Sequence, residues 1–285
     1  ALKENQGRGV ASGFWFNVGG ESSVVINMNE DGTGTIVEGS PDIGGSRASM
    51  QMMAAEELQM PVEAFSAIIG DTQNLPYSNP TGGSRTTFAT GMAVVEAAAD
   101  VVSQLKERAA ATWNITPEQV EWKDGKAINT KGEGVMTAAE ICGSAAKTGG
   151  HISGRGNISA RGASPSFAVH LADIEVDPDT GKTTVLRYTA IQDAGKAIHP
   201  SYVEGQYQGG SAQGIGWALN EEYVYSSDGR LENPGFLDYR IPLASDLPMI
   251  ELSLIHISEP TRLLSISFCV LCVKKKRGGG GGGGG

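Results

Sequence analysis

Cysteine is scarce in this chain, which holds three among its 285 residues. Cys269 and Cys272 lie in a C-terminal segment that differs from the rest of the sequence, so Cys142 stands alone in the remainder. One cysteine can form neither a disulfide framework nor an iron–sulfur site. Long apolar runs are also lacking: no stretch reaches the roughly 18 consecutive apolar residues that a membrane-spanning helix needs. We therefore expect no membrane span.

Basic residues are outnumbered by acidic ones. The chain has 22 Lys and Arg against 32 Asp and Glu, a formal net charge of −10. Residues 252–285 contain five of the basic residues and one of the acidic ones, which leaves 17 and 31 in residues 1–251, a net charge of −14. Nucleic-acid binding needs a basic surface, so we expect no nucleic-acid partner. The four histidines also lack the close spacing of metal ligands; they are His151, His170, His199 and His256.

Residues 252–285 differ in character from the rest of the chain. Leu252–Val273 shows neither helical period nor strand alternation, and three Lys, one Arg and eight Gly follow it. Translating a run of A that passes into a run of G gives this order, and the stretch 253–262 resembles translated sequencing-adapter sequence. The alternative, a lipid-facing segment with a lysine anchor, has only the eleven residues of Leu263–Val273, about half of what a bilayer core requires. We interpret residues 252–285 as non-native and expect them to pack against nothing.

The rest of the sequence predicts an α+β fold in which two strand–turn–strand–helix units follow one another. We place the first unit in residues 1–148 and the second in residues 149–251. For the first unit the pattern predicts a hairpin, a helix, a short strand and a long Ala/Val-rich helix; the segments are Val24–Asn27 with Thr33–Glu38, Ala48–Gln59, Phe65–Ile69 and Thr87–Trp113. For the second it predicts two strands and a Gly-rich helix, at Phe167–Val176, Thr183–Gln192 and Val203–Leu219.

The motif Gly-Gly-Ser-Arg occurs twice, each time directly before a predicted helix. We call Gly44–Arg47 the first loop and Gly82–Arg85 the second loop. Glycines let a backbone approach a ligand closely, the free N–H groups of a helix start attract anions, and arginine adds charge with a forked donor. A glycine turn in which the serine caps the helix would explain either loop without a ligand. Two such loops favour a ligand that carries several phosphates or other anionic groups.

Gln206 is a further candidate for ligand binding. It lies among small residues in the stretch 204–210, and its amide offers both a donor and an acceptor to the edge of a heterocycle. The alternative is a polar residue on a helix that packs tightly through its glycines. Ser46 and Ser84 have no visible His–Asp partners, so a nucleophilic serine is not favoured.

Several ordered stretches resemble the xanthine dehydrogenase/aldehyde oxidase family of molybdenum hydroxylases, in its large, cofactor-binding subunit. The first loop lies within Glu38-Gly-Ser-Pro-Asp-Ile-Gly-Gly-Ser-Arg47, and the second within Pro80-Thr-Gly-Gly-Ser-Arg-Thr-Thr-Phe-Ala-Thr-Gly91. A third block runs through His170–Asp177, Asp193–Gly195, His199-Pro200 and Glu204–Gln206, and Phe236–Pro242 with Asp246–Pro248 continues it. The resemblance covers nearly all of residues 7–251 and implies repeated strand–strand–helix subdomains of a molybdopterin-binding domain, incomplete at both ends.

The resemblance implies a molybdenum–pyranopterin cofactor, in bacterial relatives often the cytosine dinucleotide form. The cofactor-binding residues that it implies are Gly44, Gly45, Ser46, Arg47, Gly82, Gly83, Ser84, Arg85, Thr86 and Gln206. The family hydroxylates carbon with water-derived oxygen and sends the electrons through iron–sulfur clusters to a flavin. These 2Fe-2S and FAD centres are expected in an iron–sulfur subunit and an FAD subunit, or in other domains.

Two departures from the family pattern bear on function. Many relatives have glutamine where this chain has Gly45, so one side-chain contact to the cofactor is lost. The family's catalytic glutamate lies some tens of residues beyond Asp246–Pro248, past the start of the non-native segment, so we assign no catalytic residue. We also expect loops that face the substrate to be missing before Ala1.

The sequence therefore predicts a fragment of an oxidoreductase that acts on a small molecule: an aldehyde, a purine, an N-heterocycle or an aromatic acyl compound. A non-catalytic module that holds a nucleotide or phosphate is the alternative. A Gly-rich segment bearing glutamate further along the parent reading frame would support the enzyme, and a natural stop would support the module. We expect a cytoplasmic location, and the missing N-terminus leaves a periplasmic one open.

Overall fold

The computed structural model describes residues 2–69, 73, 77–193 and 195–255, apart from the side chains of residues 162–165 and 255. The described chain forms two compact units. We call residues 16–164 the loop unit, because it contains both Gly-Gly-Ser-Arg loops, and residues 2–15 with 165–255 the terminal unit. Two long strands, β1 (Gln6–Met28) and β7 (Ser153–Val176), contribute to both units and are hydrogen-bonded neighbours.

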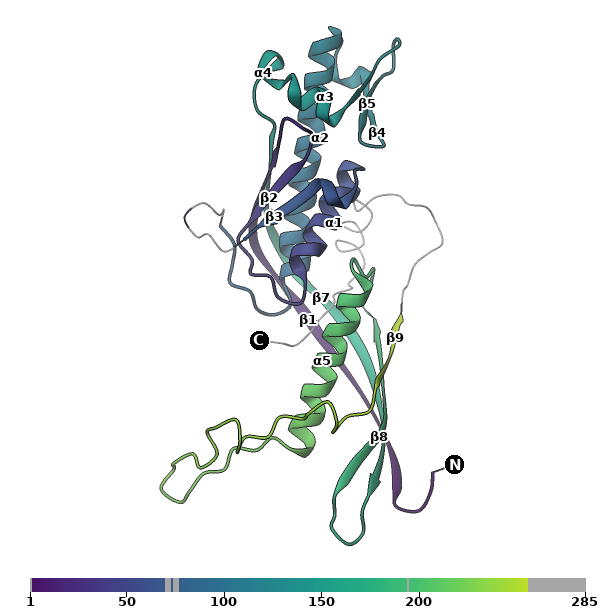
Figure 1. Cartoon of the computed structure of the whole chain (residues 1–285), viewed down its shortest axis with the longest axis vertical. Helices are drawn as coiled ribbons and strands as arrows, with labels where there is room; N and C mark the ends of the chain where they lie inside the picture. The colour runs from purple at the N-terminus through teal and green to yellow at the C-terminus, as the bar shows by residue number, and fades with distance from the viewer. Residues whose placement is uncertain (1, 70–72, 74–76, 194, 256–285) are drawn as a thin grey trace. The chain divides into compact units, whose positions relative to one another are not determined.

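The loop unit has a sheet in the order β3-β2-β1-β7 with helices packed on it (Figure 1). Its remaining elements are β2 (Gly34–Glu38), α1 (Ser46–Leu58), η1 (Val62–Ala64), β3 (Phe65–Ile68), η2 (Thr86–Thr90), α2 (Gly91–Trp113), η3 (Pro117–Gln119), β4 (Val120–Lys123), β5 (Lys126–Asn129), β6 (Val135–Thr137), α3 (Ala138–Gly143) and α4 (Ala145–Thr148). The strands β4, β5 and β6 form a separate antiparallel sheet. The four main segments predicted for this unit are confirmed, and their ends agree to within about two residues except at β1, which begins at Gln6 and not at Val24.

The hairpin of β1 and β2 provides the sheet residues that line the core. The strands pair antiparallel, with Ile26 opposite Ile36, and the carboxylate of Asp31 accepts hydrogen bonds from the N–H and hydroxyl of Thr33 in the turn. Alternate residues are buried, as expected for a sheet with one face covered. Ile26 and Ile36 are both 0% exposed.

Helix α2 is the centre of the loop unit. It begins after the π-helical turn η2 and ends where Asn114 adopts a left-handed conformation. Its alanines allow β7 to approach closely: a Cβ built on Gly156 would stand 1.9 Å from the carbonyl oxygen of Ala93, and one on Gly154 would stand 2.2 Å from that of Ala97. Glycine at these two positions therefore sets the distance between the helix and the sheet.

Helix α2 bears on the expectation that no helix spans a membrane. The continuous helix Thr86–Trp113 is long and apolar enough, by length and composition, to cross a membrane. However, 67% of its most apolar window is buried inside the protein. A helix that covers a sheet in a folded core has the same composition, and α2 packs in this way.

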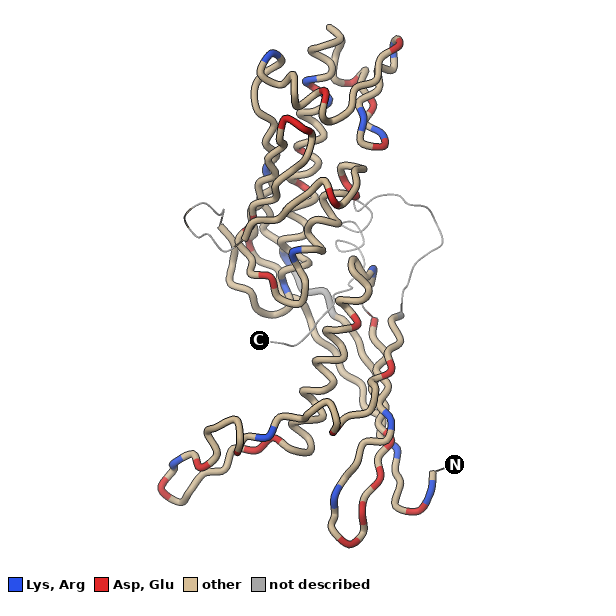
Figure 2. Tube along the Cα trace, in the orientation of Figure 1, with Lys and Arg blue, Asp and Glu red and all other residues tan. Residues whose placement is uncertain are grey.

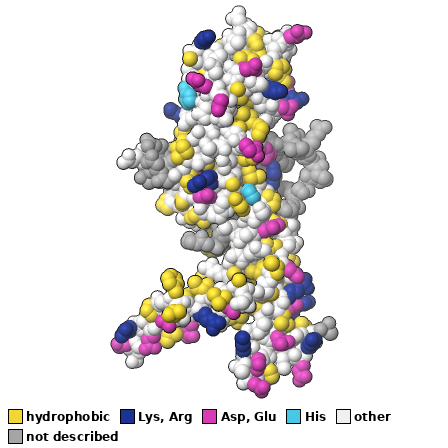
Figure 3. Space-filling model, in the orientation of Figure 1, with side chains coloured by type: hydrophobic (Ala, Val, Ile, Leu, Met, Phe, Trp, Pro, Cys, Tyr) yellow, Lys and Arg dark blue, Asp and Glu magenta, His cyan; other side chains and the backbone are white. Residues whose placement is uncertain are grey.

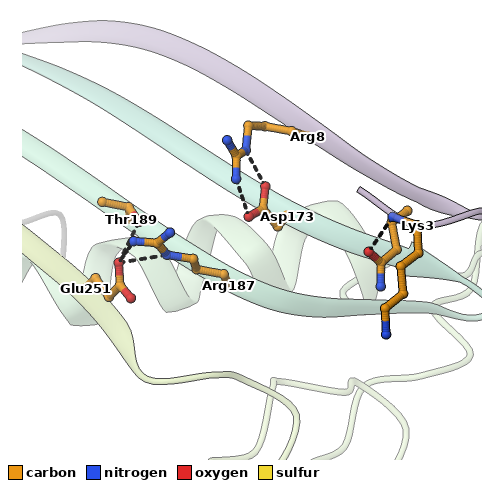
Figure 4. A network of polar contacts seen from close by, with 7 residues as sticks. Lys3, Arg8, Asp173, Arg187, Thr189 and Glu251 are labelled. Carbon is orange, nitrogen blue, oxygen red and sulfur yellow. Dashed lines mark hydrogen bonds and ion pairs between the residues drawn. The ribbon is translucent and has the colours of Figure 1, made fainter. Parts of the chain in front are cut away.

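The terminal unit has the strand order β1-β7-β8-β9, with helix α5 against β8 and β9. Its further elements are β8 (Thr183–Asp193), α5 (Pro200–Leu219) and β9 (Ile250–Ile255). Two ion pairs link neighbouring strands (Figure 4): Arg8 on β1 with Asp173 on β7, and Arg187 on β8 with Glu251 on β9, each with a closest distance of 2.6 Å. The order β7-β8-α5 repeats the strand–strand–helix pattern of β1-β2-α1, as the sequence predicts.

The boundaries of the units differ from the expected ones. We placed the division between residues 148 and 149, whereas the compact units divide at 15/16 and 164/165. The cause is the pairing of β1 with β7, which joins residues 2–15 to the C-terminal half. The sequence pattern missed the first half of both strands, because residues 6–16 and 153–166 are rich in Gly, Ser and Arg rather than in β-branched residues.

The expectation that residues 252–285 pack against nothing is wrong for the first four of them. Leu252–Ile255 continue strand β9, which pairs parallel with β8 so that Leu252 lies opposite Ala190. The run Ile250-Glu-Leu-Ser-Leu alternates apolar and polar residues, and a boundary at Leu252 cuts this alternation in two. Residues 256–285 lie outside the described part of the chain.

Charge is mixed over the described surface. Figure 2 shows Lys and Arg interspersed with Asp and Glu along both units. Apolar side chains are exposed on the segment that follows α5 (Figure 3), where Phe236 is 100% and Leu237 97% exposed.

Candidate functional site

The first loop leads into helix α1 without a side-chain cap. Gly44 and Gly45 both have positive φ, 63° and 81°, a conformation that costs glycine little. Gly45 is the N-cap residue of α1 and Ser46 is the first helical residue. The hydroxyl of Ser46 lies 3.3 Å from the carbonyl oxygen of Pro41, so it does not accept a hydrogen bond at the helix start. The interpretation of this serine as an N-cap is wrong.

Asp42 supplies an anionic oxygen at the start of α1. Its Oδ1 accepts a hydrogen bond from the N–H of Arg47 at 3.0 Å, and its Oδ2 lies 3.6 Å from Nε of the same arginine. Helix starts stabilise negative charge in this way. The helix start thus holds a carboxylate of the protein itself, and Asp42 offsets part of the charge that Arg47 offers to a ligand.

The second loop has the same backbone character. Gly83 and Ser84 have φ of 62° and 57°, and η2 begins at Thr86 without a side-chain cap. The carbonyl oxygen of Gly83 accepts a hydrogen bond from Val18 N–H at 2.8 Å, and a Cβ on Gly83 would stand 2.6 Å from Cγ2 of Val18. Around Gly82, by contrast, a Cβ would meet no atom within 4 Å. The loop is therefore fixed on one side by β1 and open on the other.

Arg85 has a different role from the one expected. The side chain is 2% exposed, and its Nε donates to the carbonyl oxygen of Gly19. Its two terminal nitrogens contact the carbonyl oxygens of Asn79 and Glu21 and the hydroxyls of Ser78 and Ser22, at 2.6 to 3.4 Å. A guanidinium has five N–H donors, so these contacts account for all of them. Burial also lowers the pKa of Arg85. This arginine holds the second loop against β1 instead of presenting its fork to a ligand.

The donors left to the two loops are mainly backbone N–H groups and hydroxyls. Thr86 has a buried Oγ1 without a hydrogen-bond partner among the described residues. Buried polar atoms are normally paired, so this hydroxyl suits a bound polar group beside the second loop. Together with the open space at Gly82, it shows that the loop fits a phosphate-bearing cofactor, whose oxygens accept from such donors.

The two loops lie on neighbouring segments of the loop unit. Helix α1 packs against α2 and η2, and the hydroxyls of Ser40 and Thr90 are 2.9 Å apart. Ser40 precedes the first loop and Thr90 follows the second. The prediction that both loops end at a helix start is confirmed. Gln206 lies in α5 of the terminal unit, so its place beside the loops stays a prediction.

Glu38 is a residue that the sequence analysis did not single out. It is 0% exposed at the end of β2, its Oε2 accepts a hydrogen bond from Ser40 N–H, and its Oε1 has no partner among the described residues. Burial is the main cause that raises its pKa. The signal was present in the sequence, because Glu38 shares the buried face of Ile36, two residues earlier. Within the residues that the structure describes, no group of three or more His, Cys, Asp and Glu could hold a metal.

Comparisons with known proteins find relatives over most of the chain. The family model of the molybdopterin cofactor-binding domain matches residues 2–248. The xanthine dehydrogenase molybdenum-binding subunit of Escherichia coli O157:H7 is 30% identical over 241 residues, which cover 82% of this chain and 32% of that protein. The nicotine 6-hydroxylase large subunit of Paenarthrobacter nicotinovorans is 30% identical over 249 residues, covering 84% and 30%. The chain thus spans about a third of the length of these relatives.

Solved structures share the fold. Quinoline 2-oxidoreductase from Pseudomonas putida 86 superposes with a TM-score of 0.79 at 24% identity, over 92% of this chain and 36% of that one. CO dehydrogenase from Oligotropha carboxidovorans gives a TM-score of 0.81 at 20% identity, over 91% and 35%. The expected α+β architecture is confirmed.

Proposed function

The chain belongs to the molybdopterin cofactor-binding domain family, and from this membership we propose that it is the cofactor-holding part of a molybdenum hydroxylase large subunit. The complete protein would oxidise an aldehyde, a purine, an N-heterocycle or an aromatic acyl compound with water-derived oxygen. The named relatives, a xanthine dehydrogenase subunit and a nicotine 6-hydroxylase subunit, support the purine and the N-heterocycle in this range. The bound cofactor supplies the redox chemistry at carbon.

One observation supports the proposal: two helix starts whose N-cap residues make no side-chain capping bond, each preceded by two residues with positive φ, lie on packed neighbouring segments. Nothing in the side-chain capping of these helices requires the glycines, since neither serine caps its helix. Glycine suits the positive φ of these positions and also lets a ligand approach the backbone closely. We infer the cytosine dinucleotide form of the cofactor because its pyrophosphate offers acceptor oxygens to the second loop and to the charge of Arg47 at the first.

Each residue of the two loops has a proposed part in binding. The backbone N–H groups offered to the cofactor would be those of Gly44, Gly45, Gly82 and Gly83. The hydroxyl groups would be those of Ser46, Ser84 and Thr86. Arg47 would add positive charge at the surface. Arg85 would act indirectly, by holding the second loop in position. Gln206 would reach a heterocycle edge from the terminal unit. We assign no general base to the described residues and expect the 285-residue chain to be inactive by itself, because the family's glutamate is not among the residues that match.

The proposal includes partners and location. Electrons would leave through 2Fe-2S clusters and FAD held by an iron–sulfur subunit and an FAD subunit, and the complex would be cytoplasmic. Copurification of a tagged large subunit with proteins that carry iron and flavin, followed by cell fractionation, tests both points.

The decisive experiment measures cofactor in the complete protein. The parent gene is expressed with its neighbouring subunits, and molybdenum is measured per large subunit together with the CMP that acid hydrolysis releases. We expect about one of each. Molybdenum without CMP would exclude the dinucleotide form.

Substrate turnover separates the enzyme from the alternative, a non-catalytic nucleotide-binding module. Bleaching of the iron–sulfur and flavin absorbance on adding an aldehyde or N-heterocycle, without oxygen, supports the enzyme. Bound nucleotide in a protein that lacks molybdenum and is reduced by no substrate of these classes would support the module.

A further inference from the structure

Four buried side chains, those of Arg85, Ser22, Thr90 and Ser40, are hydrogen-bonded one to the next, and the backbone N–H of Ser40 donates to a fifth, that of Glu38. We call the set Arg85, Ser22, Thr90, Ser40 and Glu38 the buried polar chain. Nη2 of Arg85 lies 2.8 Å from Oγ of Ser22, which lies 2.9 Å from Oγ1 of Thr90. Thr90 lies 2.9 Å from Oγ of Ser40, whose N–H donates to Glu38 at 2.5 Å. None of the five side chains is more than 2% exposed.

The two ends of the buried polar chain have fixed roles. A guanidinium can only donate, so the oxygen of Ser22 accepts from Arg85, and at the other end the carboxyl oxygen of Glu38 accepts from the backbone N–H of Ser40. In the two contacts between these ends, Ser22 with Thr90 and Thr90 with Ser40, either hydroxyl can donate. Connected hydrogen bonds strengthen one another in a low-dielectric interior. The path therefore behaves as one unit.

The buried polar chain connects residues that adjoin the two loops in the sequence. Arg85 is the last residue of the second loop, and Thr90 lies one turn further on. Glu38 and Ser40 end β2, where the chain enters the first loop. A displacement of either loop would break buried hydrogen bonds at the other end.

We propose that Thr90 and Ser40 are positioning residues that lock the two loops into one preorganised cradle. Their part in cofactor binding rests on the function proposed above, whereas the coupling between the loops does not. Thr90→Val keeps the shape of the side chain and removes its hydroxyl, so the hydroxyls of Ser22 and Ser40 both lose a buried partner. Buried groups that lose their partner are costly, and the loops then open more often.

Amide hydrogen exchange of the cofactor-free chain tests the coupling. The amides to follow are those of Arg47 and Ser49, which are bonded at the first loop, and that of Ala89, which is bonded after the second. In Thr90→Val we expect exchange at all three to rise about tenfold, equivalent to 1.4 kcal/mol of opening free energy, while amides of β5 stay unchanged. Thr90→Ser, which restores the hydroxyl, should return all three to the rate of the parent chain.

Two further variants keep the test decisive. Thr112→Val makes the same change near the end of α2, where the hydroxyl donates to the carbonyl oxygen of Arg108 in its own helix, and should alter none of the three amides. Ser40→Ala interrupts the buried polar chain outside the helix, so it replaces Thr90→Val if that variant fails to fold. Faster exchange at Ala89 alone, with Arg47 and Ser49 unchanged, would overturn the coupling.

The complete complex separates this inference from the proposed function. Thr90→Val should lower molybdenum per large subunit at least threefold, and Thr90→Ser should restore it. A parent complex without molybdopterin, in a protein whose loops still exchange together, would refute the proposed function and leave the coupling intact. A parent complex with full cofactor and no effect of Thr90→Val on Arg47 and Ser49 would refute the coupling alone.

Discussion

Replacing Gly156 by alanine should force α2 away from the sheet of the loop unit. The added Cβ would stand 1.9 Å from the carbonyl oxygen of Ala93 and 2.9 Å from the amide nitrogen of Ala97. The first distance is more than 1 Å inside the 3.0 Å below which real Cβ contacts essentially never fall. Both atoms belong to the helix backbone, so no side chain can rotate to make room. The helix itself must move.

The loss of stability depends on the packing that this movement of α2 disrupts. Ala93, Ala97 and Val101 are all 0% exposed, and separating α2 from β7 loosens their packing. Adding a methyl group to a well-packed core costs about 1–3 kcal/mol, and contact with backbone on both sides places this variant near 3 kcal/mol. For a unit of about 150 residues, this predicts a fall in melting temperature of roughly 6–12 °C.

Urea and thermal unfolding of the chain, followed by far-ultraviolet circular dichroism, measure this loss. Gly154→Ala should behave similarly, because its Cβ would stand 2.2 Å from the carbonyl oxygen of Ala97. Gly132→Ala is the matched control in the same unit: its Cβ would meet Asn129 at 3.7 Å, an ordinary contact, so its stability should stay within about 0.5 kcal/mol of the parent. If Gly156→Ala is as stable as Gly132→Ala, the close approach of β7 to α2 is wrong.

Three further predictions concern single residues. Glu38→Gln should stabilise the chain at neutral pH. Burial raises the folded-state pKa of Glu38 above its ordinary 4.5. The carboxyl therefore stabilises the fold fully below pH 4.5, and this contribution is lost as pH rises through the folded-state pKa. Unfolding at a series of pH values should show the gain shrinking toward pH 4, and a gain independent of pH would contradict the cause given. Cys142 should resist maleimide labelling in the folded chain, since burial raises its pKa to about 11 and only on the order of one thiol in a thousand is ionised at pH 8; labelling as fast as in urea would show that the thiol is exposed. In the complete complex, Gly83→Val should lose most of its molybdenum and turnover, because a branched side chain is strained at φ 62° and meets Val18. Arg47→Lys should keep most of its molybdenum and turnover. The reverse order would show that the site is misplaced.

The sequence predicted those elements whose patterns are local. The β-prone runs Val24–Asn27 and Thr33–Glu38 with the turn between them sufficed for the hairpin, and the spacing of Ala93, Ala97 and Val101 sufficed for α2. The two loops were found in the same way, since glycine before a helix is a local signal. Their role as a pair needed the resemblance between ordered motifs, which no single loop provides.

The features that the sequence did not predict depend on contacts between residues far apart in the chain. Nothing beside Arg85 in the sequence shows that its acceptors are Gly19 and Glu21, more than sixty residues away, so a charged residue in a loop was taken for a ligand contact. The first half of β7 was missed because Gly154 and Gly156 lower strand propensity, and they are present to admit α2. Glu38 was passed over because an acidic residue near a loop is usually solvated.

The sharing of β1 and β7 between the two units has a consequence for synthesis on the ribosome. Arg8 pairs with Asp173, which is synthesised 165 residues later, and the loop unit comprises residues 16–164. At roughly 5–20 residues per second, that interval lasts on the order of ten seconds or more. Residues 2–15 remain an unpaired strand edge, with Phe14 and Trp15 at its end, throughout this interval, because the loop unit is itself complete only at residue 164. This interval is when we expect a ribosome-associated chaperone to be needed, and a slower step between residues 150 and 176 would lengthen it.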